Sequence, residues 1–265
     1  MELDIYQVDS FTTEAFKGNP AGVCITEEAL GQEQMLSIAR EMALSETAFY
    51  VRHTGQLRWF TPQVEVALCG HGTLALAHVL KERGEAHLGD ALVFNTMSGP
   101  LTATIEEDVI ALDFPQAKLH GAEMAREKLA LLGIDEESVV SYLQFDNKEL
   151  IEIDSEQLLI SLAPSFERLK QLPGRGIVVT SKAGCNKLDF VSRYFAPWVG
   201  VNEDPVTGSA HCALAVYWGE KLNKTQLDGY QASQRGGHVN CTLLAQQRVA
   251  LRGKAKTIVK GTLYL

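Results

Sequence analysis

The sequence lacks a long apolar segment, a block of basic residues and a paired cysteine motif. No run of 18 apolar residues occurs in the 265-residue chain, so no segment is typical of a transmembrane helix. Lys and Arg total 24 against 33 Asp and Glu, giving a net charge of −9. A nucleic acid or an anionic membrane surface is therefore not an expected partner.

The cysteines are also not arranged as a disulfide framework. The five cysteines form no Cys-x-x-Cys pair, their number is odd, and a chain of this size does not need disulfides for stability. The first residues have neither the basic region nor the apolar region of a secretory signal. We therefore expect a cytoplasmic protein with reduced cysteines.

What is present is typical of a folded protein that is large enough for two cores. Hydrophobic residues make up 46% and charged residues 22% of the chain, as in soluble globular proteins. At this length one core tends to split into two. Short strand-like runs alternate with a few helical patterns, and the same order restarts after residue 115. We predict an α+β fold with lobes 1–115 and 116–265, and the C-terminal strand near 256–265 can return to the first lobe.

Hydrophobic periodicity gives the individual elements. The predicted strands are 3–8, 21–25, 47–51, 57–60, 91–94, 101–105 and 109–112, then 139–145, 150–153, 177–180 and 189–195. The predicted helices are 32–44, 72–83, 123–132 and 209–222, and further strands are predicted after the last helix, up to residue 265.

Two segments of the chain can be aligned with each other. Residues 58–62 (RWFTP) match residues 193–197 (RYFAP) at Arg, Phe and Pro. Each match is followed by a block that opens a helix, GHGTLALA at 70–77 and GSAHCALA at 208–215. Two unrelated strand-to-helix connections are the alternative, but we favour duplicated lobes with pseudo-two-fold symmetry.

Both matched helices are apolar on all sides, which is typical of buried helices. Unpaired N–H groups and the positive end of the helix dipole attract anions at a helix start. We predict a site for the carboxylate of a small acidic metabolite between the lobes, with capping by neighbouring side chains and water as the alternative. The residues at these two helix starts are Gly70, Gly72, Thr73, Gly208 and Ser209.

Five segments together carry a family resemblance. They are GNPAGV at 18–23, SETAF at 45–49, WFTP at 59–62, CGHGT at 69–73 and EDPVTGSAH at 203–211. In this order, over nearly the whole chain, they resemble the phenazine-biosynthesis PhzF-like family. The resemblance implies a diaminopimelate-epimerase-like fold, in which each lobe is a curled, mostly antiparallel sheet around a central buried helix. It also implies a cofactor-independent isomerase that moves a proton on a small acidic substrate, in a protein that is commonly a homodimer.

The resemblance assigns roles to single residues. Glu46 maps onto the catalytic acid/base, and His71, Asp204 and Ser209 map onto pocket positions. Partial burial is expected to raise the pKa of Glu46 toward the working pH, and His71 is expected to be neutral. Asp204 is expected to orient a substrate amine or hydroxyl, and Asn19 to line the pocket.

Other interpretations stay open. An amino-acid epimerase or racemase of the same fold would use the Cys69 thiol, but the aligned residue in the second lobe is Thr207, whose hydroxyl is too weak an acid. A non-catalytic protein that binds an acidic metabolite is a second alternative, and Glu65 is a weaker rival to Glu46 as base. Cys69-x-His71 lacks a further ligand at zinc-like spacing, and the segment lacks the third glycine of a dinucleotide motif, so neither a metal nor a cofactor is expected.

Overall fold

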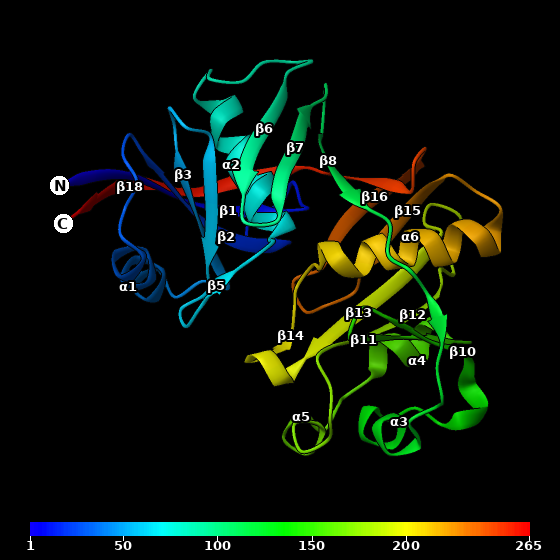
Figure 1. The fold of residues 1–265 in the computed structure, drawn as a ribbon. Helices are drawn as coiled ribbons and strands as arrows, with labels where there is room; N and C mark the ends of the chain where they lie inside the picture. Colours follow the sequence, from blue (N-terminus) through cyan, green and yellow to red (C-terminus); the bar gives the residue numbers. More distant parts are fainter. The chain divides into compact units, whose positions relative to one another are not determined.

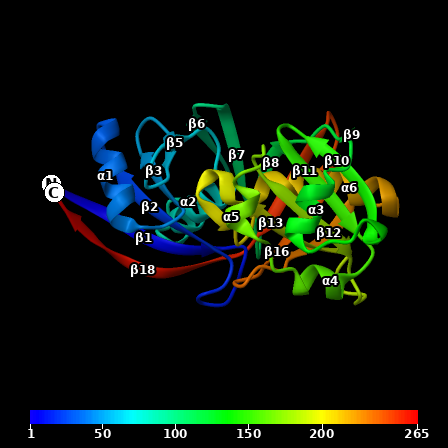
Figure 2. The ribbon, with the colours of Figure 1, turned by 90° about the horizontal axis from the view of Figure 1, so that it is seen from below.

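The chain leaves its first structural unit at residue 114 and returns to it at residue 250. In the computed structural model, which describes residues 1–265, unit 1 is Met1–Phe114 with Ala250–Leu265, and unit 2 is Pro115–Val249 (Figure 1). The return is made by β18 (Ala255–Tyr264), which pairs antiparallel with β1 (Glu2–Ser10). The two chain ends therefore lie side by side (Figure 2).

Unit 1 is a mixed sheet in which antiparallel pairs predominate. The pairs β2–β3 and β4–β6 are parallel, and the short β5 (Glu65–Val66) adds to β4. Across the sheet, β18 and β1 are followed by β2 (Asn19–Thr26), β3 (Glu46–Val51), β4 (Gln56–Phe60), β6 (Ala91–Thr96), β7 (Gly99–Ile105) and β8 (Ile110–Pro115).

The two helices of unit 1 pack on opposite faces of this sheet. The apolar helix α2 (Gly70–Glu82) contacts β1, β2, β3, β7 and β18, so the sheet curls around it. The amphipathic helix α1 (Gln32–Met42) packs on β3 and β4 through a stripe that includes Met35 and Ile38. On β4, Trp59 lies beside α2 while Phe60 belongs to the α1 cluster, as the alternation of side chains along a strand requires.

Unit 2 has a sheet of the same kind. Its parallel pairs are β11–β12 and β13–β15, and the short β14 (Val201–Glu203) adds to β13. Helix α6 (Gly208–Leu222) packs on β15 and β16. The strands in order are β9 (His120–Gly121), β10 (Val139–Phe145), β11 (Lys148–Ile153), β12 (Ile177–Lys182), β13 (Phe190–Ala196), β15 (Gln226–Gln231) and β16 (Gly237–Leu244), with β17 (Arg248–Gly253) leading back to unit 1.

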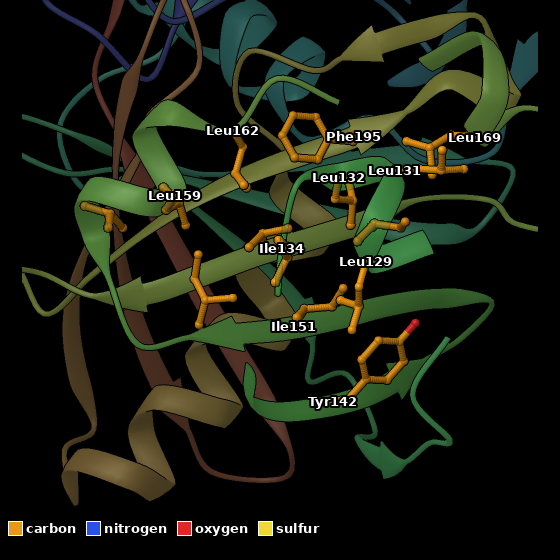
Figure 3. Packing of buried hydrophobic residues seen from close by; sticks show 14 residues of the cluster. Leu129, Leu131, Leu132, Ile134, Tyr142, Ile151, Leu159, Leu162, Leu169 and Phe195 are labelled. Carbon is orange, nitrogen blue, oxygen red and sulfur yellow. The ribbon is translucent and has the colours of Figure 1, made fainter. Parts of the chain in front are cut away.

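Smaller helices cover the unit 2 sheet and build its core. They are α3 (Arg126–Leu132), α4 (Glu156–Ser161) and α5 (Phe166–Leu169). Figure 3 shows their leucine side chains, such as Leu129 and Leu159, directed at Ile151 and Phe195 on the strands. None of the helices combines the length and apolar character needed to cross a membrane.

The two units repeat one plan of strand pairing. The series antiparallel, parallel, antiparallel, parallel, antiparallel runs from β1 to β7 and again from β10 to β16, and α2 and α6 follow the short strands β5 and β14. An ion pair recurs as well, with Arg58 Nε 2.7 Å from Glu65 Oε1 and Arg193 Nε 2.7 Å from Glu203 Oε1. The prediction of an α+β fold with a buried helix inside each of two similar halves is therefore confirmed.

Candidate functional site

Glu46 and His71 are placed by two connections of unit 1. Helix α1 ends where Ala43 adopts the left-handed conformation with φ 51°, and β3 then begins at Glu46. Parallel pairing sets Glu46 opposite Ala21 of β2. His71 lies in the first turn of the buried helix α2. The sheet thus holds the carboxylate beside the start of the helix.

Three polar side chains surround the imidazole of His71. Its Nε2 lies 3.2 Å from Glu46 Oε2 and 3.2 Å from Ser45 Oγ, and its Nδ1 lies 3.6 Å from Cys69 Sγ. Ser45 Oγ also donates to the carbonyl of Pro20 at 3.2 Å. The Glu46 side chain is 21% exposed against 8% for His71, so the carboxylate is the part of this group that solvent reaches.

Hydrogen bonds to the backbone fix the first turn of α2. Ser10 Oγ donates to the carbonyl of His71 at 2.8 Å. The Thr73 hydroxyl and the Thr73 N–H both donate to the carbonyl of Cys69, at 2.7 and 3.1 Å. Thr73, a predicted binding residue, therefore uses both of its donors inside the helix.

The charges of the pair differ from the prediction. Burial raises the pKa of Glu46, but the hydrogen bond and charge of His71, together with the Ser45 hydroxyl, outweigh burial and leave the pKa lowered. Burial opposes a charge on His71, yet its contacts with Cys69 and Glu46 raise the pKa of the imidazole well above its usual value. Burial raises the pKa of the Cys69 thiol, and the contact with His71 acts against that shift.

Two predictions are therefore wrong. The pKa of Glu46 is lowered rather than raised, chiefly by the hydrogen bond and charge of His71, and the pKa of His71 is raised, first by its contacts with Cys69 and then by those with Glu46. A buried ion pair of this kind stabilises the charged form of each partner against burial.

The other predicted residues of unit 1 lie near this pair along the chain or the sheet. Gly70 and Gly72 share the first turn of α2 with His71. A Cβ on Gly72 would lie 3.0 Å from Cys69 Sγ and 3.0 Å from Trp59 Cδ1, so any larger residue here would have to displace one of these side chains. Asn19 is buried at the start of β2.

Asp204, Gly208 and Ser209 belong to unit 2. Thr207 Oγ1 donates to Asp204 Oδ2 at 2.5 Å, so this side chain does not cap α6. Gln231 accepts from the Thr207 N–H at 2.9 Å and donates to the Asp204 carbonyl at 2.6 Å. These bonds fix the loop that carries Asp204 into α6, which begins at Gly208.

A lysine that sequence reasoning missed accompanies the start of α6. Lys148 Nζ lies 3.5 Å from Ser209 Oγ, and the lysine side chain is 16% exposed. Lys148 is far from Ser209 in the sequence, and no pattern pointed to it. Ser45 was also missed, although it directly precedes Glu46 in the SETAF segment.

Glu65 is engaged elsewhere. Both of its carboxylate oxygens accept from the Arg58 guanidinium, each at 2.7 Å. A carboxylate held on both oxygens by a guanidinium is a poor proton acceptor. The structure thus disfavours the rival base.

The repeated sheet around a buried helix is the diaminopimelate-epimerase-like fold, and in unit 1 a carboxylate and an imidazole meet at the start of that helix. A family model described as phenazine biosynthesis-like protein, PhzC-PhzF, matches residues 8–261. The chain therefore belongs to the PhzC/PhzF family.

Known proteins resemble the whole chain. A Pseudomonas aeruginosa protein named as an uncharacterized isomerase is 47% identical, with 100% of both chains covered. A crystal structure of a PhzF-family phenazine biosynthesis protein from Enterococcus faecalis is 41% identical, with a TM-score of 0.93 over 100% of both chains. A structure described as a predicted epimerase from Pseudomonas aeruginosa shares the fold, with 17% identity and a TM-score of 0.80 over 99% of both chains.

Proposed function

We propose that the protein is a cofactor-independent isomerase that moves a proton on a small carboxylate-bearing metabolite, with Glu46 as general acid and base. The observation that carries this proposal is the 3.2 Å contact between Glu46 Oε2 and His71 Nε2 at the start of a buried helix. The relative named as an isomerase supports the reaction class.

In this mechanism the ionised, partly exposed carboxylate of Glu46 removes a proton from a substrate carbon. The electron pair left behind delocalises toward the substrate carboxylate, and the His71 imidazolium stabilises the added charge. The protonated Glu46 then returns its proton to a second substrate carbon, over which the negative charge is also delocalised. One proton leaves and one is returned, so the isomerisation needs no redox partner.

The helix starts supply the proposed anion contacts. In α2 the first hydrogen bond within the helix is donated by the Thr73 N–H. The N–H groups of Gly70, His71 and Gly72 come before it and have no partner within the helix, and N–H groups in this position bind carboxylates. Gly208 and Ser209 have the equivalent place on α6, where Lys148 adds a positive charge. Asp204 and Asn19 are proposed to hold the polar groups of the substrate.

Deuterium incorporation tests the proposal. Small carboxylates that raise the melting temperature are incubated with the protein in D₂O, and carbon-bound deuterium is measured by NMR. Glu46→Gln should lower the exchange rate by at least about 100-fold, a usual contribution of a general base. Glu65→Gln, once shown to be folded, should keep the rate.

Two results would count against this function. A full exchange rate in Glu46→Gln would remove Glu46 as the base. Carboxylates that bind tightly without any exchange would favour the alternative of a non-catalytic binding protein.

A racemase that uses the Cys69 thiol as its base is not favoured. The Cys69 residue is 6% exposed, and burial raises the pKa of its thiol. The aligned residue of unit 2 is Thr207, so no second thiol occupies the matching position.

A further inference from the structure

A pocket lies at the end of α2 that is far from Glu46 and His71. Its volume is about 640 Å³, which is within the usual range of sites for small molecules. The last turns of α2 line it through His78, Lys81 and Glu82. Lys81 follows His71 by ten residues, which corresponds to about 15 Å along a helix axis. The pocket is therefore separate from the site described above.

Four segments of unit 1 that are distant in the sequence form the walls of this pocket. Besides α2, they are the loop that follows β1, the turn before β8, and residues 253–257, where the chain returns to unit 1. The Thr257 hydroxyl donates to Glu82 Oε2 at 2.6 Å, and the Thr12 N–H donates to the Lys254 carbonyl at 3.1 Å. Because these bonds join the segments directly, the pocket does not depend on a ligand for its shape.

Positive charge is concentrated in this pocket, although the chain carries a net charge of −9. Lys81, Lys254 and Lys256 all line it. Lys254 Nζ lies 4.0 Å from Asp108 Oδ2, whereas Lys81 Nζ donates to the uncharged Glu107 carbonyl at 3.3 Å. Neither Lys81 nor Lys256 forms an ion pair. At least two ammonium groups are thus available to an anion.

The two carboxylates of the pocket do not cancel this charge. Glu82 Oε2 accepts from the Thr257 hydroxyl, and Glu82 Oε1 lies 3.2 Å from His78 Nε2, so both oxygens already have neighbours of opposite polarity. The Asp108 side chain is 80% exposed, so solvent and salt screen its charge. With three lysines against two carboxylates, the surplus charge of the pocket is positive.

We propose that this pocket binds a small phosphorylated metabolite. The phosphate contacts the ammonium groups of Lys81, Lys254 and Lys256, and the organic part lies against Val109 and Ala255. A phosphate monoester carries about two negative charges and three strong acceptor oxygens, so it can use three separate lysines, whereas a carboxylate carries a single charge. Lysine is a usual phosphate ligand. The site does not rest on the proposed isomerase reaction.

Binding is tested with phenyl phosphate, a phosphate monoester with a small apolar group, and with phenol as its uncharged counterpart. A ligand that joins α2 to the returning residues 253–257 stabilises the folded chain. At constant ionic strength, phenyl phosphate should therefore raise the melting temperature, and phenol should not. Calorimetry should show that Lys256→Glu weakens the binding of phenyl phosphate by at least about tenfold.

Lys260→Glu is the matched control, because Lys260 is an exposed lysine of the same strand that does not line the pocket. It makes the same change in net charge and should leave the affinity within about twofold of the wild type. Equal losses in the two variants would show that binding follows net charge alone and would overturn the proposal. So would a wild-type protein that does not bind phenyl phosphate.

A diffraction measurement locates the ligand without any variant. Wild-type crystals soaked in phenyl phosphate should show the phosphate group in contact with Lys81, Lys254 and Lys256. Density only at the starts of α2 and α6, where anion contacts are also proposed, would contradict this pocket and support those contacts instead.

Discussion

At the scale of single residues, Ser45 tests whether the imidazole has to be held in place. Its hydroxyl lies 3.2 Å from His71 Nε2 and donates to the Pro20 carbonyl, so it connects the ring to β2. Ser45→Ala removes one hydrogen bond, and we expect kcat to fall by about tenfold while KM changes little. Steady-state kinetics measure both constants, and Ser45→Thr should restore kcat.

Ser37→Ala is the control for Ser45, because the Ser37 hydroxyl bonds to the Glu33 carbonyl within α1. This variant should leave both constants unchanged. A higher KM with an unchanged kcat in Ser45→Ala would instead indicate that Ser45 binds substrate.

Sequence reasoning predicted Glu46 and His71 as site residues, but it did not predict the directions of their pKa shifts. Glu46 and His71 were both recognised from their motifs. The lowered pKa of Glu46 depends on a 3.2 Å contact with His71, a residue from a different element, and no local pattern encodes that distance. Burial alone predicts a neutral pair, whereas the contact favours a charged one. Ser45 was missed for the same reason.

At the scale of elements, Gly229 determines how closely β15 approaches β13. Gly229 lies opposite Phe190 in the parallel pair, and a Cβ on Gly229 would lie 2.4 Å from Phe190 Cζ. The Phe190 ring stacks on Trp218 of α6 at 6.1 Å, so it has little room to move. Gly229→Ala should therefore lower the free energy of unfolding by about 1–3 kcal/mol.

Gly261 provides a matched strand glycine in β18, where an added Cβ meets no atom within 4 Å. In urea unfolding, Gly261→Ala should stay within about 0.5 kcal/mol of the wild type. Equal losses in the two variants would show that the clash with Phe190 is not the cause.

The repeated arginine–glutamate pairs give another prediction for elements. Arg58–Glu65 fixes β5 before α2, and Arg193–Glu203 fixes β14 before α6. Their side chains are 11–25% exposed, so removing one charge should cost more than at the surface. Glu65→Gln and Glu203→Gln should each lose about 1–2 kcal/mol in urea unfolding, against at most about 0.5 kcal/mol for Glu27→Gln.

Glu27 serves as the reference because its pair with Arg52 is open to solvent, with 69% exposure of the Glu27 side chain. A loss in Glu27→Gln as large as in the two buried pairs would contradict this account.

The predicted elements match the observed ones to within a few residues because their hydrophobic patterns are long. The elements that were missed are short. Helices α4 and α5 have six and four residues, and strands β5 and β14 have two and three, too few to display a period. The internal repeat is also unequally spaced, because Gly70 lies eight residues after Pro62 and Gly208 lies eleven after Pro197. The extra three residues match the length of the 3-10 helix Pro197–Val199 before β14.

At the scale of the whole molecule, the two units share the order of strand pairings but differ in the residues at the start of the buried helix. Unit 1 has Cys69 and His71 where unit 2 has Thr207 and Ser209, so the imidazole and its carboxylate belong to unit 1 alone.

The net charge of −9 disfavours the binding of large polyanions, but it does not oppose the binding of a small carboxylate. Backbone N–H groups at helix starts bind such an anion without formal charge.

The stability of the whole molecule should depend on pH through a histidine outside the proposed site. His211 is buried in α6, its Nδ1 contacts the Thr207 carbonyl at 2.8 Å, and its Nε2 has no partner. Burial lowers its pKa to about 4, while an unfolded histidine titrates near 6.5. Between these values the unfolded chain binds more protons, so stability falls as the pH decreases, by about 2 kcal/mol between about pH 7 and pH 5.

The internal repeat supplies the variant that isolates this effect. Thr73 has the same place in α2 as His211 in α6, and its hydroxyl bonds to the equivalent Cys69 carbonyl. His211→Thr should keep that contact and remove the titration. In urea unfolding at the two pH values, the stability difference between wild type and His211→Thr should therefore shrink by about 2 kcal/mol at the lower pH. A stability difference for His211→Thr that is constant with pH would show that His211 is protonated equally in the folded and unfolded chains.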